Sequence, residues 1–310
     1  MADPLKIHKA QADETRLRLE RLLSQGPLNV NEIIDVLHMG QSRISRHLKI
    51  LAEAELVSNR REGTWVYYHA NSHSAGNLTS EMLDLLRRHE HDLPFHDEDL
   101  QGLEGVVERR HAQSRDFFNK VEDPRQLHQG LQQNGDSYRQ IAMSLMQHRH
   151  RSVLDLGTGA GLLLPRLLEK AEQVIAVDSS TKMLEMARHT AGSAAGRCDF
   201  RLGDLAHLPV ANGEVGAVMA CMVLHHLSNP AGTIAEAHRA LKPGGELFIV
   251  DLCKHDDETF RESQADLWLG FEPTEIERWL ATNDFDLLDT GMAGDTGSSH
   301  QLITFRGRKK

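Results

Sequence analysis

The sequence feature that most constrains the fold is the stretch from Val153 to Leu164, VLDLGTGAGLLL. It begins as an apolar run and then places glycine at alternate positions, Gly157, Gly159 and Gly161. Glycine lets a backbone turn sharply and lets a ligand approach without a side chain in the way. A helix after such a turn directs its free N–H groups at the ligand, and Pro165 is harmless in its first turn. The stretch predicts a buried strand, a ligand-binding turn and a helix.

Strand-like and helix-like segments alternate from residue 151 to the end of the chain. The predicted strands are 152–156, 173–178, 198–202, 215–221, 245–251, 284–290 and 299–306. The predicted helices between them are 161–170, 181–190, 230–241 and 273–283. Such alternation predicts a mostly parallel sheet with helices on both faces, and the last two segments read as a hairpin-like pair. Sheets of this kind bind ligands at the carboxyl ends of their strands.

The glycine spacing excludes a dinucleotide fingerprint, because Leu162 stands where that pattern needs glycine or alanine. Asp178 ends the second predicted strand, 23 residues after Asp155. A carboxylate there can accept hydrogen bonds from both hydroxyls of a ribose. The segments GDL at 203–205, ACMVLHHL at 220–227 and LKPGGELFIVD at 241–251 follow the next strands in order.

Taken together, these motifs resemble class I methyltransferases that use S-adenosylmethionine, and the match spans 151–306. The resemblance implies that S-adenosylmethionine or S-adenosylhomocysteine binds here, with Asp204 accepting from the adenine amino group. The residues it assigns to this ligand are Asp155, Gly157, Thr158, Gly159, Gly161, Asp178, Ser179, Met183, Gly203, Asp204, Leu205 and Met222.

His225 and His226 follow the fourth predicted strand at the mouth of this site. One of them can serve as a general base near neutral pH, or the pair can have a structural role. No methyl acceptor is identifiable, since the Asn/Asp-Pro-Pro-aromatic motif of DNA amino methyltransferases and a cysteine cluster are both absent. The spacing of Cys198, Cys221 and Cys253 fits neither a zinc knuckle nor a disulfide framework.

The N-terminal residues predict a different module. An amphipathic helix over 13–23 is followed by a shorter helix that begins at Asn29, with Glu32 as its capping-box partner. Ile44, Leu48 and Leu51 then give a second helix over 41–54 an apolar face. Strands at 56–61 and 64–69 follow, with a turn at 62–63. This order predicts a helix-turn-helix with a hairpin wing.

The run from Asp13 through Tyr68 resembles the winged-helix domain of ArsR/SmtB-type bacterial repressors. The resemblance implies a homodimer on double-stranded operator DNA. Residues Gln41, Ser42, Ser45 and Arg46 are then placed near bases, and Lys49, Arg60 and Arg61 near phosphates. Metal-sensing members carry cysteine pairs before the turn, whereas the first hundred residues here contain none, so we assign no metal.

Charge is unevenly distributed along the chain. Residues 1–75 contain ten Lys/Arg and nine Asp/Glu, a balance of +1. Because the net charge of the chain is −10, residues 76–310 carry −11. Such asymmetry suits a nucleic-acid-facing module at the N-terminus. No apolar run is long enough to span a membrane, and the N-terminus has no secretory core, so we expect a cytoplasmic protein.

The connector after the wing predicts a helix over 76–91, suited to the dimer contact, and another over 98–121. Between them, His89, His91 and His96 with an acidic residue form either a solvated linker or a zinc site. The stretch 117–149, with Asp116-Phe-Phe-Asn and Tyr138, resembles segments that cover the ligand in small-molecule methyltransferases.

The sequence thus predicts two domains, an α+β winged helix-turn-helix and an α/β Rossmann-like class I methyltransferase fold. The predicted boundaries are 1–92 for DNA binding and dimerisation, 93–150 for the linker and cover, and 151–310 for the adenosyl ligand. Two functions fit. The first is a transcriptional repressor whose operator affinity is controlled by S-adenosylhomocysteine or S-adenosylmethionine, as in regulators of the methionine cycle that the fusion resembles. The second is an active small-molecule methyltransferase with an autoregulatory winged helix.

Overall fold

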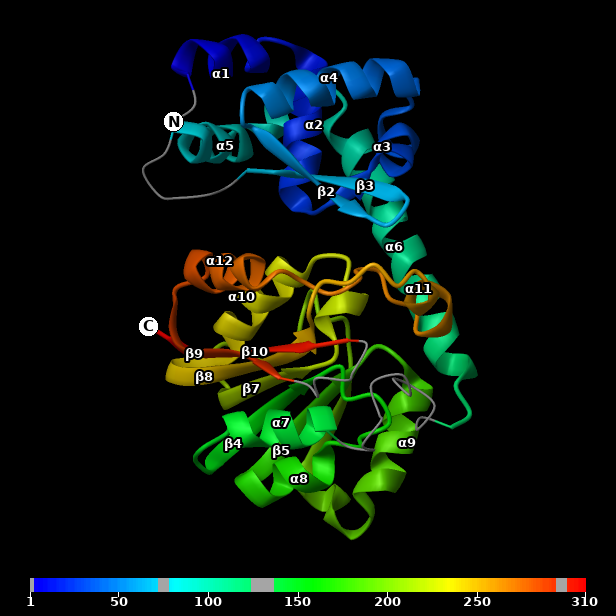
Figure 1. The fold of residues 1–310 in the computed structure, drawn as a ribbon, viewed down its shortest axis with the longest axis vertical. Helices are drawn as coiled ribbons and strands as arrows, with labels where there is room; N and C mark the ends of the chain where they lie inside the picture. Colours follow the sequence, from blue (N-terminus) through cyan, green and yellow to red (C-terminus); the bar gives the residue numbers. More distant parts are fainter. Residues whose placement is uncertain (1–2, 72–77, 124–136, 294–299) are drawn as a thin grey trace. The chain divides into compact units, whose positions relative to one another are not determined.

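The computed structural model of the 310-residue chain describes residues 3–71, 78–123, 137–293 and 300–310 (Figure 1). The chain divides into two compact units, 1–112 and 113–310, and each is described by itself. No helix in the described ranges is both long enough and apolar enough to cross a membrane.

The first unit is mainly helical, with a small three-stranded sheet in the order β1-β3-β2. Its elements are α1 (Pro4–Gln11), α2 (Glu14–Gln25), β1 (Leu28–Asn29), α3 (Val30–Leu37), α4 (Gln41–Glu53), β2 (Val57–Glu62), β3 (Trp65–Ala70), α5 (Leu78–Arg88), the 3-10 turn η1 (Glu90–Asp92) and the first part of α6 (His96–Lys120). Helix α1, which Asp3 caps and which Pro4 begins, was not predicted from the sequence.

The helix-turn-helix forms as predicted. Asn29 caps α3 by accepting a hydrogen bond from the Glu32 N–H, while the Glu32 carboxylate accepts one from the Asn29 N–H. The predicted apolar face of α4, made of Ile44, Leu48 and Leu51, is fully buried in the core of the unit. The two helices are thereby held at a fixed angle by a local cap and by the core beneath them.

The wing is the antiparallel pair of β2 and β3. Glu62 pairs with Trp65, so the two-residue turn is Gly63-Thr64, one residue later than predicted. Gly63 has φ of 58°, a left-handed conformation that favours glycine in hairpin turns.

The N-terminal half of α6 belongs to the core of the first unit. Leu103 and Val106 are buried against the other helices. Asp99, also buried, receives hydrogen bonds from the guanidinium groups of Arg18 at 2.7 and 2.8 Å and of Arg21 at 3.0 Å. The compact unit therefore extends to residue 112, past residue 93, where the linker was predicted to begin.

The second unit is built on a seven-stranded sheet in the order β6-β5-β4-β7-β8-β10-β9. Its strands are β4 (His150–Leu156), β5 (Ala171–Asp178), β6 (Cys198–Leu202), β7 (Val215–Cys221), β8 (Leu241–Leu252), β9 (Phe285–Ala293) and β10 (Leu302–Lys309). Its helices, with two 3-10 segments, are α7 (Ser137–Leu145), α8 (Leu164–Lys170), α9 (Thr181–Ala191), η4 (Gly192–Arg197), η5 (Leu224–His226), α10 (Pro230–Ala240), α11 (Thr259–Ser263) and α12 (Pro273–Thr282).

The sheet confirms the predicted mostly parallel architecture. The pairs β4–β5, β5–β6, β4–β7 and β7–β8 are parallel, whereas β10 runs antiparallel to both β8 and β9. Helices α10 and α12 lie on one face of the sheet and α7, α8 and α9 on the other (Figure 1). Strand order reverses between β4 and β7, the place where such sheets bind ligands.

Candidate functional site

The glycine-rich loop between β4 and α8 adopts the sharp turn that its sequence predicts. Gly157, Gly159 and Gly161 all have left-handed φ angles, 64°, 53° and 75°. A Cβ on Gly161 would lie 2.8 Å from the Ala187 Cα, and one on Gly157 would collide with Val223. A Cβ on Gly159 would meet no atom within 4 Å. The outer two glycines therefore permit close packing, whereas the central one faces open space.

Asp178, at the end of β5, holds this loop in place. Its carboxylate accepts hydrogen bonds from the Gly159 N–H at 2.8 Å and from the Ser180 N–H at 2.9 Å. Burial raises the pKa of Asp178, and the backbone hydrogen bonds oppose that shift. The acidic residue predicted to bind ribose thus lies directly beside the central glycine.

Asp155, at the end of β4, is a second buried acid. Burial raises its pKa to about 7, and the Asp178 carboxylate adds to this effect. Its Oδ2 atom accepts no hydrogen bond from any residue that the structure describes. A buried acceptor without a donor is costly, so a donor from a bound ligand fits this position.

The other residues assigned to the ligand come from the segments after β6 and β7 and from the start of α9. The Gly203 N–H donates to the Asp178 carbonyl, so the segment after β6 adjoins the end of β5. Asp204 is exposed and accepts from the Ala206 N–H, while Leu205 is buried. Met222 is buried in a left-handed conformation at φ of 55°.

Ser179 is exposed, whereas Thr158 and Met183 are buried. The Met183 N–H donates to the Ser180 hydroxyl, which caps α9. The ends of β4, β5, β6 and β7 therefore bring the assigned residues to one edge of the sheet.

The end of α6 lies at this edge, in a segment that was predicted only as part of a cover over the ligand. Asn119 accepts a hydrogen bond from the Ser180 hydroxyl at 2.7 Å, and its carbonyl accepts one from the Lys182 ammonium at 2.9 Å. Phe118 packs edge-on against His226, with ring centroids 5.1 Å apart. Tyr138 is buried in the core of the unit, and residues 124–136 of the expected cover lie outside the described ranges.

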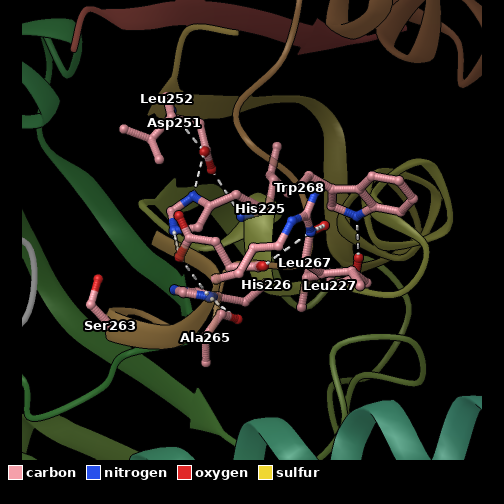
Figure 2. A network of polar contacts seen from close by, with 12 residues as sticks. His225, His226, Leu227, Asp251, Leu252, Ser263, Ala265, Leu267 and Trp268 are labelled. Atoms are coloured by element: carbon pink, nitrogen blue, oxygen red, sulfur yellow. Dashed lines mark hydrogen bonds and ion pairs between the residues drawn. The ribbon is translucent and has the colours of Figure 1, made fainter. Parts of the chain in front are cut away.

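His225 and His226 form the 3-10 turn η5 after β7 (Figure 2). His225 is fully buried, and its Nδ1 lies 2.6 Å from the Asp251 carboxylate. Burial alone would lower the pKa of His225, but the carboxylates of Asp251 and Asp266 outweigh it and raise the pKa to about 9. Neither acid was predicted as a partner of His225 from the sequence, because they lie 26 and 41 residues further along the chain.

The predicted DNA-binding residues of the first unit are mostly exposed to solvent. Gln41, Ser42, Ser45, Arg46 and Lys49 are exposed on α4, opposite its buried apolar face. On the wing, Arg61 is exposed. Arg60 forms an ion pair with Glu62, whose side chain is fully buried, and is itself only 15% exposed. Arg60 is therefore less available to a phosphate than the sequence suggested.

The linker histidines do not assemble into a metal site in the described ranges. His96 Nδ1 lies 2.6 Å from the Arg21 guanidinium, and its Nε2 lies 3.0 Å from His91 Nδ1. Both ring nitrogens of His96 are thus engaged. All three cysteines are free: Cys198 begins β6, Cys221 ends β7 and Cys253 follows β8.

Both units have relatives among known proteins. Residues 13–59 match the model for bacterial regulatory proteins of the arsR family, and residues 154–249 match a methyltransferase domain. The chain is 42% identical over 71 residues to the arsenical resistance operon repressor of Escherichia coli K12, covering 23% of this chain and 61% of that protein. It is 35% identical over 105 residues to the arsenite methyltransferase of Halobacterium salinarum, covering 33% of this chain and 27% of that protein.

A solved structure shares the fold of the second unit. It is the N-methyltransferase NodS from Bradyrhizobium japonicum WM9 in complex with S-adenosyl-L-homocysteine, with a TM-score of 0.50 and 18% sequence identity. The match covers 64% of this chain and 97% of that one. The chain spans less than two thirds of the length of the curated relatives it matches, for example 34% and 64% of two of them.

Proposed function

Because the chain joins an ArsR-family helix-turn-helix domain to a methyltransferase domain, we propose that it is a ligand-responsive transcriptional repressor. In this proposal a homodimer binds operator DNA in the cytoplasm. S-adenosylhomocysteine or S-adenosylmethionine in the second unit controls the affinity of the dimer for DNA.

The exposed face of α4 supports the DNA-binding part of the proposal. A helix whose apolar side is buried and whose polar, basic side is exposed can enter the major groove, where Arg46 reads base edges and Lys49 contacts phosphate. The exposed Leu85 on α5, 43% accessible beside the buried Leu83 and Leu86, offers an apolar contact for a second copy of the chain.

The open space at Gly159 supports the ligand-binding part. Gly159 is half-buried with no atom within 4 Å of an added Cβ, the Asp178 carboxylate lies beside it, and the Asp155 carboxylate has an unsatisfied oxygen. An adenosyl ligand brings two ribose hydroxyls and an ammonium group, which match these acceptors. S-adenosylmethionine would supply a methyl group on its sulfonium, whereas S-adenosylhomocysteine is the demethylated form of the same ligand.

The observation that carries the regulatory proposal is the extent of α6. Residues 96–112 of this one helix belong to the first unit, and residues 113–120 belong to the second. In the first unit Asp99 binds the two arginines of α2, and in the second Asn119 binds Ser180, two residues from Asp178. A ligand that shifts the last turns of α6 therefore acts on a helix that is also part of the DNA-binding core.

The required coupling is small. A tenfold change in DNA affinity corresponds to about 1.4 kcal/mol of differential ligand binding between two states of the protein. Loss or gain of one hydrogen bond to a charged group is worth about 1.5–3 kcal/mol. Rearrangement around Asp178 and Ser180 is therefore sufficient in magnitude.

The test measures DNA binding by the full-length protein while each adenosyl ligand is titrated. A duplex selected from a random pool by the protein serves as the probe, and fluorescence anisotropy reports its Kd. We expect one adenosyl ligand to change this Kd at least about tenfold. Asp178→Asn should abolish the response and leave ligand-free DNA binding intact, whereas Glu172→Gln, at the exposed start of the same strand, should leave both intact.

A second pair of variants tests the DNA-binding surface. Arg46→Ala should weaken DNA binding by about 1–3 kcal/mol, whereas Lys242→Ala, an exposed charge in the second unit, should not change it. If both adenosyl ligands bind but neither changes the DNA affinity, the regulatory proposal fails.

The buried His225–Asp251 pair favours the alternative of an active methyltransferase. It lies at the end of β7, at the ligand edge of the sheet. Because the pKa of His225 is raised to about 9, its imidazole can accept the proton that an acceptor loses on methylation only at alkaline pH. Incubation with labelled S-adenosylmethionine and a library of small hydroxy, amino and thiol compounds distinguishes the two functions. Methyl transfer without any effect on DNA affinity supports the enzyme.

A further inference from the structure

Three potential metal ligands converge beside η5. Asp266, in the loop after α11, places its Oδ1 atom 3.7 Å from His225 Nε2 and 3.6 Å from His226 Nδ1. One ligand atom from each of the three residues lies within 4.8 Å of the others, the only such group in the described ranges. Figure 2 shows the imidazoles of His225 and His226 side by side in this network, with ring centroids 4.1 Å apart and ring planes tilted by 56°.

The Asp266 carboxylate lies within ion-pair distance of both imidazoles but lacks the hydrogen-bond donors that a buried charge needs. Its side chain is 1% exposed, and neither of its oxygens accepts a hydrogen bond from the described part of the chain. The distances to the two histidines are too long for hydrogen bonds. An acid enclosed in this way calls for a cation or a proton between it and its neighbours.

His225 is oriented from its other side. Its Nδ1 lies 2.6 Å from Asp251 Oδ1, and the Asp251 carboxylate also accepts from the Leu224 and Leu252 N–H groups at 2.9 and 2.8 Å. Nδ1 therefore faces the Asp251 carboxylate, and Nε2 on the other side of the ring faces Asp266. A carboxylate that orients a histidine in this way is the usual outer partner of a metal-binding imidazole.

Backbone hydrogen bonds join the loop that bears Asp266 to the turn that bears the histidines. The Leu267 and Trp268 N–H groups both donate to the His225 carbonyl, at 3.0 and 2.9 Å. The Trp268 indole N–H donates to the Leu227 carbonyl at 2.7 Å. The three side chains therefore lie on a fixed frame, which a metal site requires.

We propose that His225, His226 and Asp266 bind a divalent transition-metal ion of the zinc class. Two imidazoles and one carboxylate suit Zn²⁺, Co²⁺ or Ni²⁺, whereas Mg²⁺ and Ca²⁺ prefer oxygen ligands alone. Three protein ligands leave a position open for water or another ligand. The site does not depend on whether an adenosyl ligand regulates DNA binding.

The ion would also fix a ring that contacts α6. The His226 imidazole packs edge-on against Phe118 in the last turns of that helix. A metal bound to His226 therefore holds the surface on which the end of α6 rests.

The experiment uses the metal-free full-length protein. Equilibrium dialysis against Zn²⁺ gives stoichiometry and affinity, and Co²⁺ gives visible d–d absorption bands when its ligand set is tetrahedral or five-coordinate. Because the chain has 19 histidines, the result rests on matched variants and not on binding alone. We expect one tight equivalent in the wild type, and its loss, with the cobalt bands, in Asp266→Asn and in His226→Gln.

Asp257→Asn is the matched control. Asp257 also lies near an imidazole, with its Oδ2 3.6 Å from His300 Nε2, but it is 38% exposed and accepts hydrogen bonds from Thr259. This variant should keep the tight equivalent. Asp266→Asn removes a buried acid without a hydrogen-bond donor, so its thermal unfolding midpoint in the absence of metal should not fall below that of the wild type.

A wild-type protein that binds Zn²⁺ no more tightly than Asp266→Asn overturns the proposal. So does a cobalt spectrum identical to that of the hydrated ion. In either case a proton held on His225 between two carboxylates accounts for the cluster. These outcomes are separate from the DNA-binding test, which uses no added metal and measures the DNA affinity of a different variant, Asp178→Asn.

Discussion

Substitution of Gly159 by alanine separates the ligand-binding role of the loop from its structural role. Gly159 has φ of 53°, so a Cβ adds strain, but no atom lies within 4 Å of the position it would take. An alanine in the left-handed region costs about 1 kcal/mol. For a unit of this size, that lowers the thermal unfolding midpoint by about 2–4 °C.

The same substitution at Gly161 should cost much more. There the Cβ would lie 2.8 Å from the Ala187 Cα, which is backbone and cannot move aside without shifting α9. Overpacking of this kind adds about 1–3 kcal/mol to the strain of the left-handed conformation. Gly161→Ala should therefore lower the midpoint by about two to four times as much as Gly159→Ala.

Ligand affinity should fall strongly in Gly159→Ala, although this substitution costs little stability. If an adenosyl ligand occupies the open space, the Gly159→Ala methyl group displaces it, and S-adenosylhomocysteine affinity measured by calorimetry falls at least about tenfold. Wild-type protein at a ligand concentration of 100 times Kd gains about 2.7 kcal/mol, a shift in midpoint that Gly159→Ala should lose.

Gly192→Ala is the matched control for this measurement. Gly192, at the far end of α9, has φ of 51° and likewise nothing within 4 Å of a Cβ, so its alanine carries the same strain away from the loop. Its variant should bind the ligand as the wild type does. Unchanged ligand affinity in Gly159→Ala, with a midpoint like that of Gly192→Ala, would refute the placement of the ligand.

Two further predictions concern buried charges in the first unit. Burial raises the pKa of Glu20 from 4.5 to about 7, so the native state holds a proton that the unfolded chain releases between these pH values. The free energy of unfolding therefore falls as pH rises through this window, by about 3 kcal/mol in total. Glu20→Gln should match the wild type at about pH 4 and exceed it at about pH 8 in urea denaturation, and equal slopes with pH would contradict this. Asp99→Asn leaves the buried guanidinium groups of Arg18 and Arg21 without their carboxylate and should cost about 3–5 kcal/mol by the same assay. Asp35→Asn, which breaks an exposed pair, should cost less than about 1 kcal/mol, and similar losses in both variants would refute the reasoning.

Features encoded by neighbouring residues were predictable from the sequence. The capping box of Asn29 and Glu32 spans three residues, and the alternate glycines of the loop sit within a single turn. The position of Asp178 at the end of β5 was predictable because the residue closes an apolar run, while its contact with ribose stays a prediction. In each case the physical cause is local, so one stretch of sequence contains it.

Partnerships between distant residues were not predictable. Asp99 meets Arg18 across 81 positions, and Asp251 meets His225 across 26, after the chain has crossed to a neighbouring strand. Asp266 lies in an irregular loop that carries no periodic pattern. Without a fold, nothing in the sequence distinguishes these acids from others on the surface.

The long helix α6 determines how this protein can be dissected. A fragment that stops at residue 92 would omit Leu103 and Val106, whose removal uncovers apolar core, and would leave the arginines of α2 buried without Asp99. Such a fragment should aggregate during expression. A DNA-binding fragment that folds by itself has to extend to residue 112, and its new C-terminus will then be a freely ending helix.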